Sequence, residues 1–282
     1  MKKFWRRLNQ NKGAVVGLVV LAIFILISIL SPLLAPYDPH QIFDGKFNLP
    51  PLWSGGDNAH VMGTDDIGRD VLSRLIYGAR ISLTVGFLVV TISLVVGVSL
   101  GLLAGYFGGW VDQIIMRGVD ILMALPSILL AIVIVAILGP SLQNGIIAVS
   151  IVYLPNYIRV VRGAAMAEKK KAYVDATKCF GATHWRQAVI NILPNCMAPI
   201  IVLASLGFSE GILNVAALGF LGLGAQPPIP EWGVMLADAK AFIETSPWLV
   251  SLPGICILLV VLSFNLLGDG LRDALDPKLK GQ

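Results

Sequence analysis

Long stretches without a single charged residue constrain this chain more than any other feature. Residues 13–37, 81–111 and 121–158 contain no Asp, Glu, Lys or Arg. A membrane-spanning helix needs about 20 apolar residues to cross roughly 30 Å of hydrocarbon, so each stretch is long enough. Charged residues make up 13% of the 282 residues, and the mean hydropathy is +0.79. The sequence therefore predicts an all-α integral membrane protein and argues against a disordered chain, a coiled coil or a nucleic-acid-binding domain.

We predict six transmembrane helices. The longest uncharged stretch exceeds one span, and Gly139-Pro140-Ser141 supplies a turn signal that divides it. Pro126 and Pro155 lie inside predicted spans, where each removes a backbone hydrogen bond and can kink the helix. The six predicted spans are residues 14–34, 81–111, 114–138, 145–161, 197–221 and 248–267.

Basic residues orient these spans. They gather in the N-terminal arm and in the segment between spans four and five, which four helices separate, so both lie on one side of the membrane. The positive-inside rule makes that side the cytoplasm. The tail at 270–282 falls there too, so both termini are predicted to be cytoplasmic. Arg69, Arg74 and Arg80 crowd the outer end of span two against this rule, where nearby aspartates can pair with them.

The extracytoplasmic segment 36–79 is predicted to be a loop followed by a short amphipathic helix. Apolar residues from Ile67 to Ile76 recur on one helical face, which indicates a helix over 64–77 lying on the outer surface. Thr64 or Asp65 could cap it. Its role is either packing or contact with an extracytoplasmic partner.

The cytoplasmic loop, about 163–194, carries a helical pattern over 172–180. Gly181 then supplies a left-handed terminator, Thr183 can cap a second helix over 184–193, and Pro194 marks its end. We expect Tyr173, Val174, Phe180 and Trp185 to be exposed, which favours a docking surface over a solvated basic loop.

Glu210 is the one acid well inside span five, about 20 Å from Met197 at 1.5 Å per residue. Such a group normally faces a cavity or a polar partner. It is either a pathway residue near a substrate amine or a hydrated group at the outer mouth, if the Gly-rich stretch after Leu218 ends the helix early. The chain has no Walker A loop, so we expect it neither to bind nor to hydrolyse ATP.

The spacing of the cytoplasmic loop resembles the EAA motif of ABC importer permeases, EAA-x3-G-x9-I-x-LP. Asp175-Ala176-Thr177, Gly181 and Leu193-Pro194 match it, with Asp for Glu, Thr for the second Ala and Asn191 for the first Ile. The segments from His60 to Arg80, Gly219 to Gly233 and Phe264 to Lys278 are similar to the OppC/DppC branch of binding-protein-dependent peptide permeases. Gly224 to Pro228 and Asn195 to Pro199 look most like the dipeptide permeases of that branch.

This resemblance implies a type I ABC importer permease fold with a cytoplasmic coupling helix. It places an arm and first helix at 1–35, the outer loop at 36–79, the permease domain at 80–269 and a tail at 270–282. The residues expected to couple to an ATPase are Tyr173, Val174, Asp175, Ala176, Lys178 and Gly181. The implied partners are a second permease (DppB-like), two ATPases (DppD-like and DppF-like), a binding protein (DppA-like) and membrane lipid, without nucleic acid.

The implied function is a transport subunit, not an enzyme, that moves dipeptides or short peptides, and also haem, across a bacterial inner membrane. No cofactor is expected on this chain, because ATP and Mg belong to the partner ATPases. The same architecture could import oligopeptides, nickel complexes or antimicrobial peptides. A proton-coupled secondary carrier is the alternative from a different class, although six spans with a single deep Glu fit it poorly.

Overall fold

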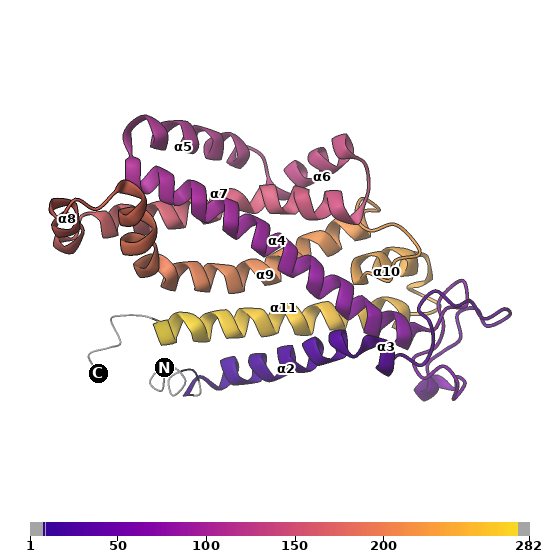
Figure 1. The fold of residues 1–282 in the computed structure, drawn as a ribbon. Helices are drawn as coiled ribbons and strands as arrows, with labels where there is room; N and C mark the ends of the chain where they lie inside the picture. The colour runs from indigo at the N-terminus through magenta and orange to yellow at the C-terminus, as the bar shows by residue number, and fades with distance from the viewer. Residues whose placement is uncertain (1–7, 9, 276–282) are drawn as a thin grey trace.

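The computed structural model describes Leu8 and residues 10–275, and the elongated bundle in it is built from long helices (Figure 1). The basic residues predicted to orient the chain at 2–7 and 278–280 lie outside the described residues, as does the tail from 276 onward. Within the described part, pairing between extended segments is limited to two isolated bridges in the 42–70 region. The helices are α2 Lys12–Ile29, α3 Ser31–Leu34, η1 Leu52–Ser54, α4 Val71–Phe107, α5 Gly109–Met123, α6 Ser127–Leu138, α7 Leu142–Lys169, α8 Ala172–Cys179, η2 Arg186–Ile192, η3 Leu193–Cys196, α9 Met197–Phe220, α10 Trp232–Ala239, η4 Lys240–Phe242 and α11 Trp248–Leu275.

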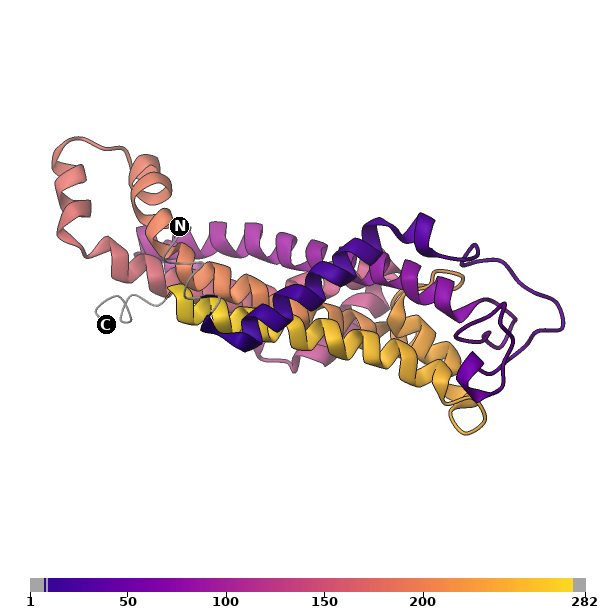
Figure 2. The ribbon, with the colours of Figure 1, turned by 90° about the horizontal axis from the view of Figure 1, so that it is seen from below.

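Six traverses alternate in direction along the bundle, as predicted. Five helices are individually long and apolar enough to cross a membrane, and α5 with α6 makes the sixth traverse as a bent pair. The start of α2, the end of α11 and the whole of α8 lie at one end of the bundle, opposite the 36–70 loop (Figures 1 and 2). This arrangement agrees with the predicted order of crossings. The predicted turn at 139–141 is confirmed, because α6 ends at Leu138 and α7 begins at Leu142.

The third span and the outer amphipathic helix differ from their predictions. The third span is not one helix over 114–138, because α5 and α6 meet at 92° around Pro126. Proline has no amide hydrogen and its ring clashes with the preceding turn, so the helix stops there. The amphipathic helix at 64–77 is also absent as a separate element. Residues 64–70 are loop, and the helical pattern from Val71 onward belongs to the first turns of α4.

Asp70, rather than Thr64 or Asp65, caps α4. Its carboxylate accepts hydrogen bonds from the Ser73 amide at 2.8 Å and from the Ser73 hydroxyl at 2.7 Å. His60 lies against the other carboxylate oxygen at 3.0 Å, and both side chains are almost fully buried. Val71 and Leu75 also point into the bundle and are buried. Part of the apolar face that looked like a surface helix therefore packs inside the protein, while Ile67 stays exposed.

Three glycines four residues apart let α4 and α7 pack closely. A Cβ added at Gly101 would lie 2.7 Å from the Ile158 carbonyl oxygen, and one at Gly105 would lie 2.8 Å from the Ala165 Cβ. Gly97 meets Tyr157 in the same way. Small residues at this spacing allow helix backbones to approach each other in a membrane. The contact positions α7, from which the cytoplasmic loop departs.

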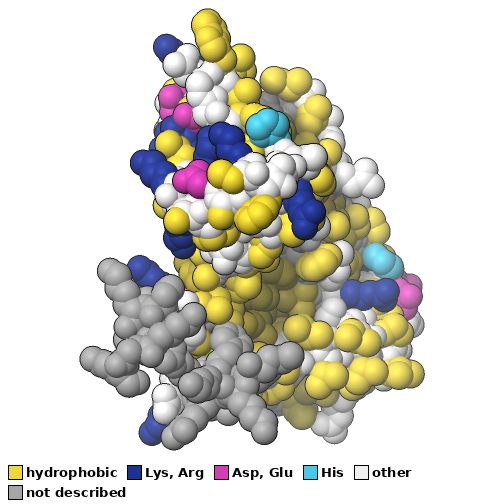
Figure 3. Space-filling view, turned by 60° about the vertical axis from the view of Figure 1, so that its left-hand side comes forward, with side chains coloured by type: hydrophobic (Ala, Val, Ile, Leu, Met, Phe, Trp, Pro, Cys, Tyr) yellow, Lys and Arg dark blue, Asp and Glu magenta, His cyan; other side chains and the backbone are white. Residues whose placement is uncertain are grey.

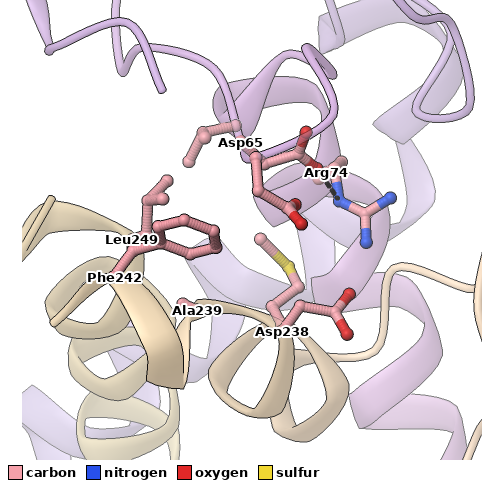
Figure 4. Close-up of a pocket in the computed structure, with 9 residues that line it drawn as sticks. Asp65, Arg74, Asp238, Ala239, Phe242 and Leu249 are labelled. Atoms are coloured by element: carbon pink, nitrogen blue, oxygen red, sulfur yellow. Dashed lines mark ion pairs between the residues drawn. The ribbon is translucent and has the colours of Figure 1, made fainter. Parts of the chain in front are cut away.

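Two of the three arginines at the outer end, Arg69 and Arg74, lie beside acidic neighbours, as the sequence suggested. Arg69 binds Asp65 at 2.6 Å and lies 3.7 Å from Asp238 on α10, while Arg74 lies 3.5 Å from Asp65. Figure 4 shows Arg74 and Asp65 facing each other, with Asp238 opposite. Burial raises the pKa of Asp238, while the two arginines oppose that shift. The cluster joins α4 to α10 and accounts for basic residues on the outer side.

Candidate coupling helix and membrane carboxylate

Helix α8 and the chain around it project beyond the end of the bundle (Figure 2). Gly181 has φ +77°, the left-handed conformation predicted for it, and reverses the chain directly after α8. Asp175, Ala176 and Lys178 are exposed, and Phe180 is 91% exposed. Lys and Arg side chains gather on this projection among apolar ones (Figure 3). The segment thus offers a small mixed surface of charged and aromatic groups.

Val174 was predicted to be exposed, and this is wrong. Its side chain is 3% exposed and packs in a cluster with Tyr106 of α4, Ala165 of α7 and Ile192 of η2. An eight-residue helix must turn one face toward the bundle, and Val174 provides the apolar anchor on that face. It holds α8 in place rather than presenting a side chain to a partner.

Tyr173 is 39% exposed, but its hydroxyl is turned toward the protein. It donates a hydrogen bond to the Glu168 carboxylate at 2.7 Å and accepts one from the Asn195 amide at 3.0 Å. Lys171 binds the second Glu168 oxygen at 2.6 Å. Burial, together with Glu168, raises the pKa of Tyr173 to about 12, so the hydroxyl keeps its proton. The cluster clamps α8 to α7 on one side and to η3 on the other.

The return segment is helical from His184, and the Thr183 hydroxyl accepts from the Arg186 amide, as predicted, but the helix does not end at Leu193. Arg186–Ile192 is a π-helical turn, and Leu193–Cys196 continues it as a 3₁₀ turn into α9. Pro194 does not end the helix, because it occupies the first turn of that 3₁₀ segment, where a missing amide hydrogen costs nothing. The return segment therefore continues into α9 without a break.

Tyr106 at the end of α4 fixes the return segment from the other side. Its hydroxyl contacts the His184 ring nitrogen at 2.8 Å and the Gln187 side chain at 2.9 Å. Sequence reasoning missed Tyr106, Glu168 and Asn195 as positioning residues. For Glu168 a signal existed, since it is a lone acid beside three lysines in an otherwise basic segment.

We expect Tyr173→Phe to weaken the attachment of α8 without removing its apolar packing. The loss of one hydrogen bond to a carboxylate costs about 1.5–3 kcal/mol. Limited proteolysis of the purified protein should therefore cut the 170–185 segment several-fold faster. Lys178→Ala, which alters an exposed side chain of the same helix, should leave the rate unchanged. Equal rates for Tyr173→Phe and wild type would contradict the clamp.

Glu210 lies on α9 thirteen residues from Met197 and ten from Phe220. The helix ends at Phe220, so Glu210 lies near the middle of α9. Its backbone carbonyl accepts a hydrogen bond from the Asn214 side chain at 2.9 Å. The residue is exposed on the surface of the described chain.

Comparison with known proteins identifies the family. The family described as "Binding-protein-dependent transport system inner membrane component" matches residues 97–281, and "N-terminal TM domain of oligopeptide transport permease C" matches residues 1–51. The chain is similar to the dipeptide transport system permease protein DppC of Escherichia coli strain K12, with 59% identity over 99% of this chain and 94% of that protein. The dipeptide transport system permease protein DppC of Haemophilus influenzae is 52% identical, covering 99% of this chain and 95% of that protein.

Two further similarities extend the comparison. The di/tripeptide transport system permease protein DppC of Pseudomonas aeruginosa is 54% identical, covering 99% of this chain and 93% of that protein. A chain of the MetNI methionine ABC transporter, solved in an inward-facing conformation, has a TM-score of 0.58. The match covers 73% of this chain and 97% of the MetNI chain. The two sequences are 18% identical, so this likeness concerns the fold alone.

A helical, multi-pass protein with this family match is a transport component of the inner membrane, not an enzyme. The chain belongs to the binding-protein-dependent transport system inner membrane component family, the permeases of ABC importers.

Proposed function

We propose that this chain is a permease subunit of an ATP-driven importer that carries dipeptides or short peptides across the inner membrane. The projecting, clamped α8 carries this proposal, because a helix held against both α7 and η3 can transmit the movement of a docked protein. The substrate class follows from the relatives, which match nearly the full length of this chain. Their names specify dipeptide or di/tripeptide transport.

The proposed assembly contains a second, DppB-like permease, DppD-like and DppF-like ATPases and a DppA-like binding protein. ATP and Mg reside on the ATPases, and the end of the bundle that carries α8, the start of α2 and the end of α11 faces the cytoplasm. Asp175, Ala176 and Lys178 contact one ATPase, with Gly181 at the turn. Closure of the ATPases displaces α8, and the continuous connections to α7 and α9 carry that displacement into the membrane.

Reconstitution tests the proposal directly. In proteoliposomes holding the whole complex, we expect uptake of radiolabelled dialanine only with external binding protein and with ATP at the ATPases. A protonophore should not reduce that uptake. Uptake by this chain alone, driven by a proton gradient and indifferent to ATP, would replace the importer with a secondary carrier. Competition by oligopeptides, haem, nickel complexes or antimicrobial peptides, but not by dipeptides, would retain the architecture and change the substrate.

A further inference from the structure

One face of α9 carries an apolar surface on both sides of a single carboxylate. Ala198, Val202 and Leu206 line an apolar groove toward the α8 end of the bundle. Leu213, Ala217 and Phe220 line a second apolar groove toward the opposite end. Glu210 lies between these two sets, and the steps of three or four residues place all of them on one helical face.

Hydrogen bonds between α7 and α9 surround this residue. The Asn214 side chain donates one hydrogen to the Glu210 carbonyl oxygen and another to the Tyr153 hydroxyl. Asn214 thus joins the Tyr153 hydroxyl to the backbone of Glu210. Because the Tyr153 oxygen already accepts from Asn214, its proton is free to point at the carboxylate. Tyr153 is 9% exposed, so the support for Glu210 is buried while Glu210 itself is exposed.

A carboxylate near mid-membrane that is exposed on the chain surface cannot face hydrocarbon without a large free-energy cost. The face must therefore border water or a polar group in the assembled transporter. A carboxylate offers about four lone-pair sites, so a single hydrogen bond from Tyr153 would leave most of the acceptor capacity of Glu210 open. A cation with several N–H donors complements what remains.

We propose that Glu210 forms a subsite for the α-ammonium group of the transported peptide, with Tyr153 and Asn214 as positioning residues. The inference rests on the proposed function and adds a binding contact that every dipeptide shares, whatever its side chains. The apolar surfaces on either side of Glu210 then accept those side chains with little selectivity.

Uptake by the reconstituted complex tests the role of the charge. Glu210→Gln keeps the shape and removes the charge, and we expect dialanine uptake to fall about tenfold, as for loss of one charge-assisted hydrogen bond. ATP hydrolysis stimulated by the binding protein should stay within about twofold of wild type, so uptake per ATP falls. Glu210→Asp should restore part of the uptake. Glu244→Gln, the same change at an exposed residue outside α9, should transport like wild type.

Tyr153→Phe separates positioning from simple support of the fold. Alone it should lower uptake severalfold, but it should add no further loss to Glu210→Gln, because it acts through the carboxylate. The subsite would be overturned if the losses of uptake in Tyr153→Phe and Glu210→Gln were additive in the double variant. It would also be overturned if Glu210→Gln kept wild-type uptake, or if its uptake and ATP hydrolysis fell in parallel. Failure of the wild-type complex to take up dialanine would instead refute the proposed function.

Chemical labelling tests occupancy without the binding protein or ATP. A hydrophobic carbodiimide should modify Glu210 in the purified complex, as measured by peptide mass spectrometry. We expect dialanine to slow this modification severalfold and N-acetyldialanine, which lacks the ammonium group, to leave it unchanged. Equal protection by the two compounds, or by neither, would overturn the assignment.

Discussion

Gly181→Asp should abolish most uptake while leaving the complex assembled. The residue has φ +77°, where an ordinary side chain costs about 1–2 kcal/mol of backbone strain. No heavy atom of the described chain lies within 4 Å of a Cβ placed there, so the new side chain projects outward from the turn. It would stand beside α8, where the ATPase is proposed to dock. We expect uptake to fall more than about tenfold, with the permease still co-purifying with its partners.

Two variants separate backbone strain from crowding of the partner. Asn adopts the left-handed conformation more readily than most residues, so Gly181→Asn keeps the turn and still adds a side chain. If crowding matters, Asn and Asp should be equally inactive. Gly139→Asp is the matched control, since Gly139 has φ +91° and equally open space at the opposite end of the bundle. It should transport nearly normally, and wild-type uptake by Gly181→Asp would contradict the coupling role.

Local signals in the sequence predicted most of the architecture. The long stretches without charged residues located the six traverses, and Gly139-Pro140-Ser141 marked a break between two of them. The left-handed conformation of Gly181 was predicted because this glycine directly follows a helical pattern. Each of these depends on neighbouring residues alone. The strong break at Pro126 was anticipated only as a kink, because proline shows where a helix is interrupted but not by what angle the next helix departs.

Side-chain direction could not be predicted in the same way. Val174 and Tyr173 belong to a short helix whose orientation depends on α4, η2 and η3, which are distant in sequence. The π-helical turn at Arg186–Ile192 likewise has no distinctive residue pattern. For Glu210 the sequence supplied depth but not surroundings, and the hydrogen bonds through Tyr153 became visible only with the packing of α7 on α9. The glycine spacing at 97, 101 and 105 was a usable signal for close packing.

Replacing Gly101 with Leu should disrupt the bundle itself. A Cβ at this position would lie 2.7 Å from the Ile158 carbonyl oxygen and 2.8 Å from the Val161 Cβ. Neither atom can yield by a rotamer change, so α4 and α7 must separate, and the neighbouring contacts at Gly97 and Gly105 would be lost with them. Overpacking of a tight interior costs typically about 1–3 kcal/mol, and a forced helix separation more. We expect markedly lower membrane yield and a lower thermal midpoint in detergent.

Gly163→Leu on α7 makes the same chemical change two residues from Val161. No heavy atom of the described residues lies within 4 Å of a Cβ there, and leucine favours helix by up to about 1 kcal/mol over glycine. Its thermal midpoint should match or exceed that of wild type, so any loss in Gly101→Leu cannot be attributed to added hydrophobicity. Equal midpoints for the two variants would show that α4 and α7 do not depend on this contact. The cytoplasmic loop would then need another support, because α7 leads directly into it.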